Sequence, residues 1–283
     1  IAAWVVASAV WGPYFFTARV PGLFDITVER VLFACLLAVL LLGACTGRLA
    51  FRSSMTIEVL MFFFMCVCVA SMVRHGFTPQ LPEFPSPWNI FITGYLFPFL
   101  VFIITKQYLL SERDIFWIVA VLFALGSYIA VTAFFEFFDL RLFVFPRYIN
   151  DPTVWLHYER ARGPFLNAAY NGAAMLIGCA CGVHLLHHAR GIRRVCIGLL
   201  LLCFVPAVFF TQTRAVYVGF FILAALLTAL YTTGYPKWKL YAMPAAVALV
   251  LLLAFSPRLA SEDRRAGGVM QGIEVEQRLG LMK

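Results

Sequence analysis

Two arginines stand directly before one of the apolar segments of this chain. Arg160 and Arg162 lead into Gly163-Pro164-Phe165-Leu166-Asn167, where the proline suits the first turn of a helix. A third arginine, Arg214, follows Thr211-Gln212-Thr213 and opens another apolar segment. A guanidinium is always charged, and its planar donors match the oxygens of a phosphate. The pattern predicts a phosphate-binding site, with the alternative that each arginine only reaches lipid headgroups.

Two asparagines lie close behind the arginine pair. Asn167 and Asn171 are four residues apart, which places both on one face of a helix. They either contribute to the binding site or bond to neighbouring helices, and the sequence leaves both interpretations open. Farther along the same segment, Gly178 and Gly182 have the spacing that permits close contact between helices.

Other side chains near these motifs are able to transfer protons. His157 and Glu159 precede the arginine pair, and either is a candidate general acid or base, although an exposed loop histidine more often has no such role. Asp25 and Glu29 flank another apolar segment. They either neutralise Arg30 or another arginine on the same side, or take part in catalysis.

A histidine cluster and the cysteines complete the candidates for metal binding. His184 and His188 are spaced as two metal ligands on one helix, with His187 beside them, but no carboxylate or cysteine nearby supports a metal site. We interpret them as a cluster at the edge of the apolar segment. The eight cysteines all fall within apolar segments, which argues against a disulfide framework; they are Cys35, Cys45, Cys66, Cys68, Cys179, Cys181, Cys196 and Cys203.

The composition identifies the class of protein that carries these residues. Hydrophobic residues make up 63% of the chain and charged residues only 13%, and the mean hydropathy is +0.88. A soluble domain has about a quarter of its residues charged. Apolar runs long enough to cross roughly 30 Å of hydrocarbon recur, without the alternation of a β-barrel. We therefore predict an all-α polytopic membrane protein with about nine transmembrane helices, at residues 1–17, 28–46, 56–73, 88–105, 114–135, 164–183, 194–211, 215–232 and 239–255.

The short connections predict the orientation of these helices. Lys and Arg accumulate in cytoplasmic loops, which assigns four connections to the cytoplasm, those with Arg48 and Arg52, with Lys106 and Arg113, with Arg190, Arg193 and Arg194, and with Lys237 and Lys239. The arginine motifs at 160–162 and 214 then lie on the outer side. We expect a membrane domain over residues 1–255 with an outer loop at 136–163, and the start of a large outer loop at 256–283. The chain begins without Met and ends in a polar segment, so we expect a piece of a longer protein.

These motifs together resemble a known family. Arg160-Ala161-Arg162-Gly163-Pro164-Phe165-Leu166-Asn167, Asn171-Gly172 and Thr211-Gln212-Thr213-Arg214 look like the signature of the O-antigen ligase and O-antigen polymerase-like superfamily of multispanning bacterial glycosyltransferases. The resemblance covers mainly residues 156–220, with agreement in topology over most of the chain.

The resemblance implies an activity and a location. Such enzymes take a glycan from an undecaprenyl-pyrophosphate carrier at the periplasmic face of the inner membrane and pass it to lipid A core or a growing polysaccharide. By analogy, Arg162 or Arg160, together with Arg214, binds the pyrophosphate, with Asn167 and Asn171 in the same substrate site. An outer-loop histidine then activates the acceptor hydroxyl, and we expect this base beyond Lys283. We expect no metal, no cofactor and no nucleic-acid partner.

Two other functions compete with glycan transfer. A transporter or flippase for a lipid-linked or anionic substrate would use the same arginines without chemistry, but such proteins often break helices at mid-membrane, and no apolar segment shows a paired break. A non-catalytic membrane scaffold leaves the outer arginines unexplained.

Overall fold

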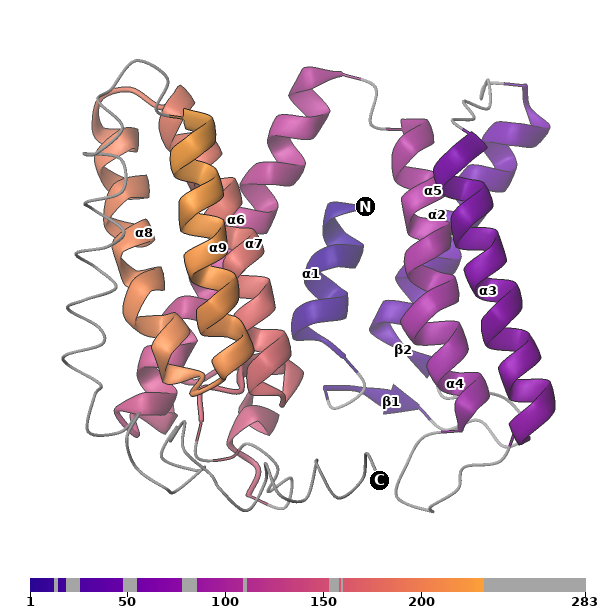
Figure 1. Ribbon diagram of the computed structural model, residues 1–283, viewed down its shortest axis with the longest axis horizontal. Coiled ribbons are helices and arrows are strands. Elements are labelled where there is room, and N and C mark those ends of the chain that lie inside the picture. Colours follow the sequence, from indigo (N-terminus) through magenta and orange to yellow (C-terminus); the bar gives the residue numbers. More distant parts are fainter. Residues whose placement is uncertain are drawn as a thin grey trace, which may run out of the picture. The chain divides into compact units, whose positions relative to one another are not determined.

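Long apolar helices make up most of the structure (Figure 1). The computed structural model describes residues 1–12, 15–18, 26–47, 55–77, 86–108, 111–152, 158 and 160–231. The chain divides into two units, one of residues 1–8 and 16–116 and the other of residues 9–15 and 117 onward. Each unit is described by itself.

Seven helices in the described ranges are long and apolar enough to cross a membrane. They contain 18 to 26 residues, and at 1.5 Å per residue even the shortest approaches the thickness of the hydrocarbon layer. The class of a multi-pass helical membrane protein is thereby confirmed. These helices cover Val28–Cys45, Thr56–His75, Pro87–Tyr108, Glu112–Phe137, Ala168–His188, Ile192–Phe210 and Arg214–Tyr231.

The predicted count of nine is not confirmed. In place of a helix over 1–17, the structure has helix α1 (Ala2–Val10), which ends seven residues before the predicted end. Gly12 and Pro13 follow it, and a proline cannot continue the hydrogen bonds of a helix. The segment 239–255 lies outside the described residues.

A small sheet also departs from the all-α prediction. Strand β1 (Thr17–Ala18) pairs antiparallel with strand β2 (Ile26–Thr27) and places Thr17 opposite Thr27. Thr27 then caps the next helix, because its hydroxyl accepts a hydrogen bond from the backbone N–H of Arg30 at 3.3 Å.

The first unit is built on α2 (Val28–Cys45), α3 (Met55–His75), α4 (Pro87–Phe91) and α5 (Phe97–Tyr108). A π-helical turn, η1 (Ile92–Leu96), joins α4 to α5 just before Pro98, which lacks a backbone donor. Phe33 stacks on Phe97 with ring centroids 4.0 Å apart. The Arg30 guanidinium donates to the Asn89 side-chain oxygen at 2.9 Å, and Asp25 lies outside the described residues.

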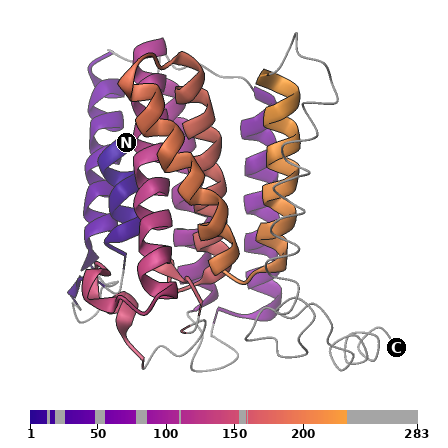
Figure 2. The same ribbon diagram turned by 90° about the vertical axis from the view of Figure 1, so that its left-hand side faces the viewer.

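The second unit contains most of α6 (Glu112–Phe137), then α7 (Ala168–His188), α8 (Ile192–Phe210) and α9 (Arg214–Tyr231). Among the described residues between α6 and α7 there are three short 3-10 turns, at Arg141–Phe143 (η2), Arg147–Asn150 (η3) and Gly163–Phe165 (η4). Helix α7 packs against both α8 and α9, and the three helices lie beside one another in Figure 1, whose left-hand side faces the viewer in Figure 2. The core between the helices includes the fully buried side chains of Ile129, Met175, Phe204 and Val208.

Glycines allow α6 and α7 to approach closely. A Cβ atom on Gly178 would lie 2.7 Å from the Cα of Gly126, and one on Gly182 would lie 2.6 Å from the Phe123 ring. Real Cβ atoms do not approach other atoms so closely. At Gly178 the close atom is backbone, so this position needs glycine, whereas at Gly182 the Phe123 side chain would have to shift. The predicted close helix contact at Gly178 and Gly182 is confirmed.

We predict that Gly178→Ala lowers the free energy of unfolding by about 1–3 kcal/mol, the usual range for an overpacked core. The methyl group would overlap the Gly126 backbone, which cannot move without shifting α6. Denaturant unfolding in detergent measures the change. Gly198→Ala is the control, because a Cβ there meets nothing closer than 4.0 Å; equal destabilisation by the two variants would contradict the prediction.

Candidate functional site

The two arginine motifs meet at one end of the second unit. The backbone N–H of Ala161 donates to the carbonyl of Phe210, the last residue of α8, at 3.0 Å. This bond joins residues 160–162 to the turn 211–213 that leads into Arg214. We call this the arginine end; it comprises the end of α6, residues 160–167 and residues 211–214, and it lies at the bottom of Figure 1.

A carboxylate at the end of α6 holds the arginine motif in place. Glu136 accepts the backbone N–H of Arg162 on Oε2 at 2.9 Å and that of Gly163 on Oε1 at 2.9 Å. A carboxylate bound to two successive amides fixes the entry to η4 much as a helix cap does. Glu136 is not among the site residues that the sequence motifs predict. Its signal is an isolated acid between phenylalanines at the end of an apolar segment.

Arg162 is buried rather than presented at the surface, with only 1% of its residue surface exposed. Its Nη2 donates to the carbonyls of Ile149 at 2.6 Å and Asp151 at 2.8 Å, and its Nε donates to Ile149 at 3.2 Å. Burial lowers the pKa of the guanidinium and the charge of Glu136 raises it, so the group stays protonated. Arg162 thus anchors the loop around Ile149, which differs from the predicted role of a fork facing a phosphate.

Tyr158 lies between two arginines of this loop. The Arg141 guanidinium carbon is 4.2 Å from the centre of the Tyr158 ring, and that of Arg162 is 4.8 Å from it. Both distances fall within the range of cation–π attraction. The ring therefore shields the buried guanidinium and links it to the 3-10 turn η2.

Asn171, on α7, also contacts the segment from Ala161 to Gly163. Its side chain is fully buried and donates from Nδ2 to the carbonyl of Ala161 at 3.1 Å. Its Oδ1 lies against Gly163, where a Cβ would come within 2.0 Å. Gly163 has φ +53°, a conformation that favours glycine. The Asn171 amide thus bonds to the segment that precedes its own helix, and this bond is not one to a neighbouring helix.

Asn167 begins α7 instead of lying on its face. Its φ of −143° and ψ of 115° are extended, and its Oδ1 accepts the backbone N–H of Ala169 at 2.9 Å and of Tyr170 at 3.2 Å. These are the features of an N-cap. The expectation that Asn167 and Asn171 share one helix face is wrong, because α7 begins at Ala168, four residues after the predicted start.

Arg160 and Arg214 are the predicted site arginines that reach the surface, and Asn167 is half-buried like Arg160. Arg160 is half-buried, and Arg214 is exposed as the first residue of α9. Arg160 also interacts electrostatically with the hydroxyl of Tyr217, which lies three residues after Arg214 and so on the same side of α9. The N-terminus of α9 adds partial positive charge, so this end of the unit favours an anion.

Among the remaining candidates, His157 and Glu159 lie outside the described residues. In the histidine cluster, His184 Nδ1 is 3.0 Å from the hydroxyl of Tyr231, and the His184 and His188 ring centroids are 4.6 Å apart. Over the described part of the chain, no three His, Cys, Asp or Glu side chains are grouped so as to hold a metal ion.

The function of this site is inferred from its geometry, because comparison with known proteins found no relative. No family model, curated protein or solved structure matches the chain. The arginine end combines two surface arginines, a helix N-terminus and a buried network that fixes the backbone between them. Such an arrangement can bind a phosphate or pyrophosphate group through charge-assisted hydrogen bonds.

Proposed function

We propose that this protein transfers a glycan from an undecaprenyl-pyrophosphate carrier to lipid A core or a growing polysaccharide, at the periplasmic face of the bacterial inner membrane. It would then be an enzyme of the O-antigen ligase and polymerase-like superfamily. The observation that supports the proposal best is the hydrogen bond between Ala161 and Phe210, which joins the two arginine motifs that carry the family resemblance.

The proposed chemistry is displacement at the first carbon of the sugar. The acceptor hydroxyl forms the new glycosidic bond, the bond to the pyrophosphate oxygen breaks, and the pyrophosphate leaves with its negative charge. Arg160 and Arg214 would bind its oxygens and stabilise the charge that develops on them. Neither a metal nor a cofactor is needed for this step, in which a general base accepts the proton that the hydroxyl loses.

Three residues behind this site act by holding its backbone in position. Glu136, Arg162 and Asn171 fix the backbone that carries Arg160, since together they bind both sides of the segment from 161 to 163. Pre-organised charge of this kind lowers a barrier without reorganisation during the reaction. Arg162 would therefore support the pyrophosphate site as a positioning residue.

We predict that Arg214→Ala reduces glycan transfer by about 100-fold or more, as loss of a charge-stabilising donor does in other enzymes. Arg214→Lys should also be impaired, because an ammonium group cannot donate two parallel hydrogen bonds. The assay uses the full-length protein in membranes with its lipid-linked glycan, and counts transferred glycan against the amount of inserted protein.

Arg190→Gln serves as the control, because Arg190 is exposed in the connection between α7 and α8 at the opposite end of the helices. Its transfer activity should equal that of the unchanged protein. Full activity of Arg214→Ala would refute the pyrophosphate role. Movement of the lipid-linked glycan across vesicle membranes without any transfer would instead favour the transporter alternative.

A further inference from the structure

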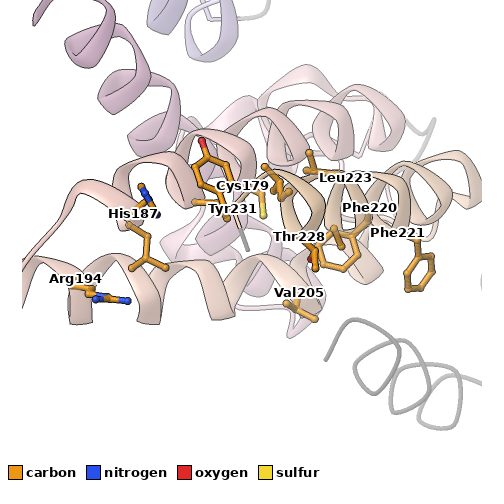
Figure 3. A pocket seen from close by; sticks show the side chains of 13 residues that line it. Cys179, His187, Arg194, Val205, Phe220, Phe221, Leu223, Thr228 and Tyr231 are labelled. Carbon is orange, nitrogen blue, oxygen red and sulfur yellow. The ribbon is translucent and has the colours of Figure 1, made fainter. Parts of the chain in front are cut away.

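A groove runs between α7, α8 and α9, with a volume of about 570 Å³ (Figure 3). This volume falls within the range of about 300–1,000 Å³ that is usual for small-molecule sites. Most of its wall is apolar, and side chains from all three helices contribute. The apolar wall includes Val183, Leu186, Val205, Phe220, Leu223 and Leu227.

Polar side chains lie at one end of this groove. His187 comes from the end of α7, Arg194 from the start of α8, and Tyr231 from the end of α9. Since α7 and α9 both finish where α8 begins, the three belong to the same end of the helices, opposite the arginine end. Figure 3 shows Arg194 and His187 together, away from Phe221. The groove therefore has one polar end and one long apolar wall, as an amphiphile requires.

The polar end carries positive charge that these helices do not neutralise. From Arg160 to Tyr231 the sequence contains no aspartate or glutamate, while Arg190, Arg193 and Arg194 lie within five residues. In the described ranges, Arg194 takes part in neither of the ion pairs, which join Lys106 to Glu58 and Arg141 to Asp139. Basic pockets between membrane helices at this level bind the headgroups of anionic lipids.

We propose that this groove binds one anionic phospholipid of the surrounding membrane. The headgroup phosphate lies against Arg194 and His187, and an acyl chain follows the apolar wall along α9. The site is separate from the glycan site, because the two occupy opposite ends of the helices. It is expected in the cytoplasmic leaflet, where the connection between α7 and α8 is assigned by its arginines.

Native mass spectrometry of the full-length protein, released from bilayers of phosphatidylcholine with phosphatidylglycerol, tests the headgroup. We expect one phosphatidylglycerol to be retained and phosphatidylcholine to be lost. Arg194→Gln should reduce retention about fivefold, as expected for one basic residue at an anionic surface. Arg193→Gln is the matched control, since Arg193 is exposed on the same turn and does not line the groove. Equal retention by the two variants, or equal retention of both lipids, overturns the proposal.

A second pair of variants tests the acyl chain. Ala224→Trp places an indole in the groove and should abolish retention, whereas Ala225→Trp, on the exposed side of α9, should not. The competing occupant is the segment 239–255. If that segment fills the groove, Ala224→Trp will lower the melting temperature and leave lipid retention unchanged, which overturns the proposal.

Discussion

Gly163→Ala is expected to destabilise the second unit by about 3 kcal/mol or more, which combines backbone strain with steric overlap. At φ +53° an alanine is strained, and its methyl group would lie 2.0 Å from Oδ1 of Asn171. Asn171 cannot move away without losing its hydrogen bond to Ala161. Thermal and denaturant unfolding in detergent measure the effect, and glycan transfer should fall with the folded fraction.

Gly191→Ala separates the backbone strain from the steric overlap. Gly191 has φ +58°, close to that of Gly163, but a Cβ there meets nothing within 4 Å. It should carry only the backbone penalty, about 1–3 kcal/mol, because its φ of +58° and ψ of −138° form a conformation that strongly favours glycine. Equal destabilisation by both variants would show that the contact with Asn171 is unimportant. In an Asn171→Ala background, Gly163→Ala should cost no more than Gly191→Ala, because the overlapping oxygen is gone.

The sequence predicts the helices well because burial in lipid leaves a simple signal. Apolar runs of about 20 residues are required for each crossing, and seven of the nine predicted segments correspond to such helices in the structure. The predicted helix over residues 1–17 was too long at its end, because hydrophobicity alone does not show where a helix stops. Trp11-Gly12-Pro13 carries no charge that would interrupt the apolar run, yet α1 ends at Val10, just before the glycine and proline.

The site was harder to predict because its contacts are distant in sequence. Charge and position were enough to mark Arg160, Arg162 and Arg214 as unusual. They did not show that Arg162 is buried, since its carbonyl partners depend on how the loop at 149–151 folds. The role of Glu136 was not predicted for the same reason, because it binds amides that lie 26 and 27 residues later in the chain.

Glu136→Gln is expected to destabilise the second unit by about 3 kcal/mol. Both carboxylate oxygens accept backbone N–H groups, from Arg162 and from Gly163. A glutamine would turn an N–H₂ donor toward one of these donors, and the buried charge of Arg162 would lose the favourable electrostatic interaction with the Glu136 carboxylate. Denaturant unfolding gives the free energy. Hydrogen exchange should quicken at the amides of residues 161–163, which identifies the segment that is released.

Asp139→Asn is the matched control. Like Glu136→Gln, it replaces a carboxylate by an amide of the same shape, and the two positions are close in the chain. The Asp139 side chain is 80% exposed and pairs with Arg141 at the surface. Exposed ion pairs contribute at most about 1 kcal/mol, and asparagine tolerates the positive φ at this position. Equal unfolding free energies for the two variants would contradict the anchoring role. If Glu136→Gln lost glycan transfer but kept its stability and its slow exchange, Glu136 would act on the substrate itself, and the arginine end would contain a proton-transfer group as well as a pyrophosphate site.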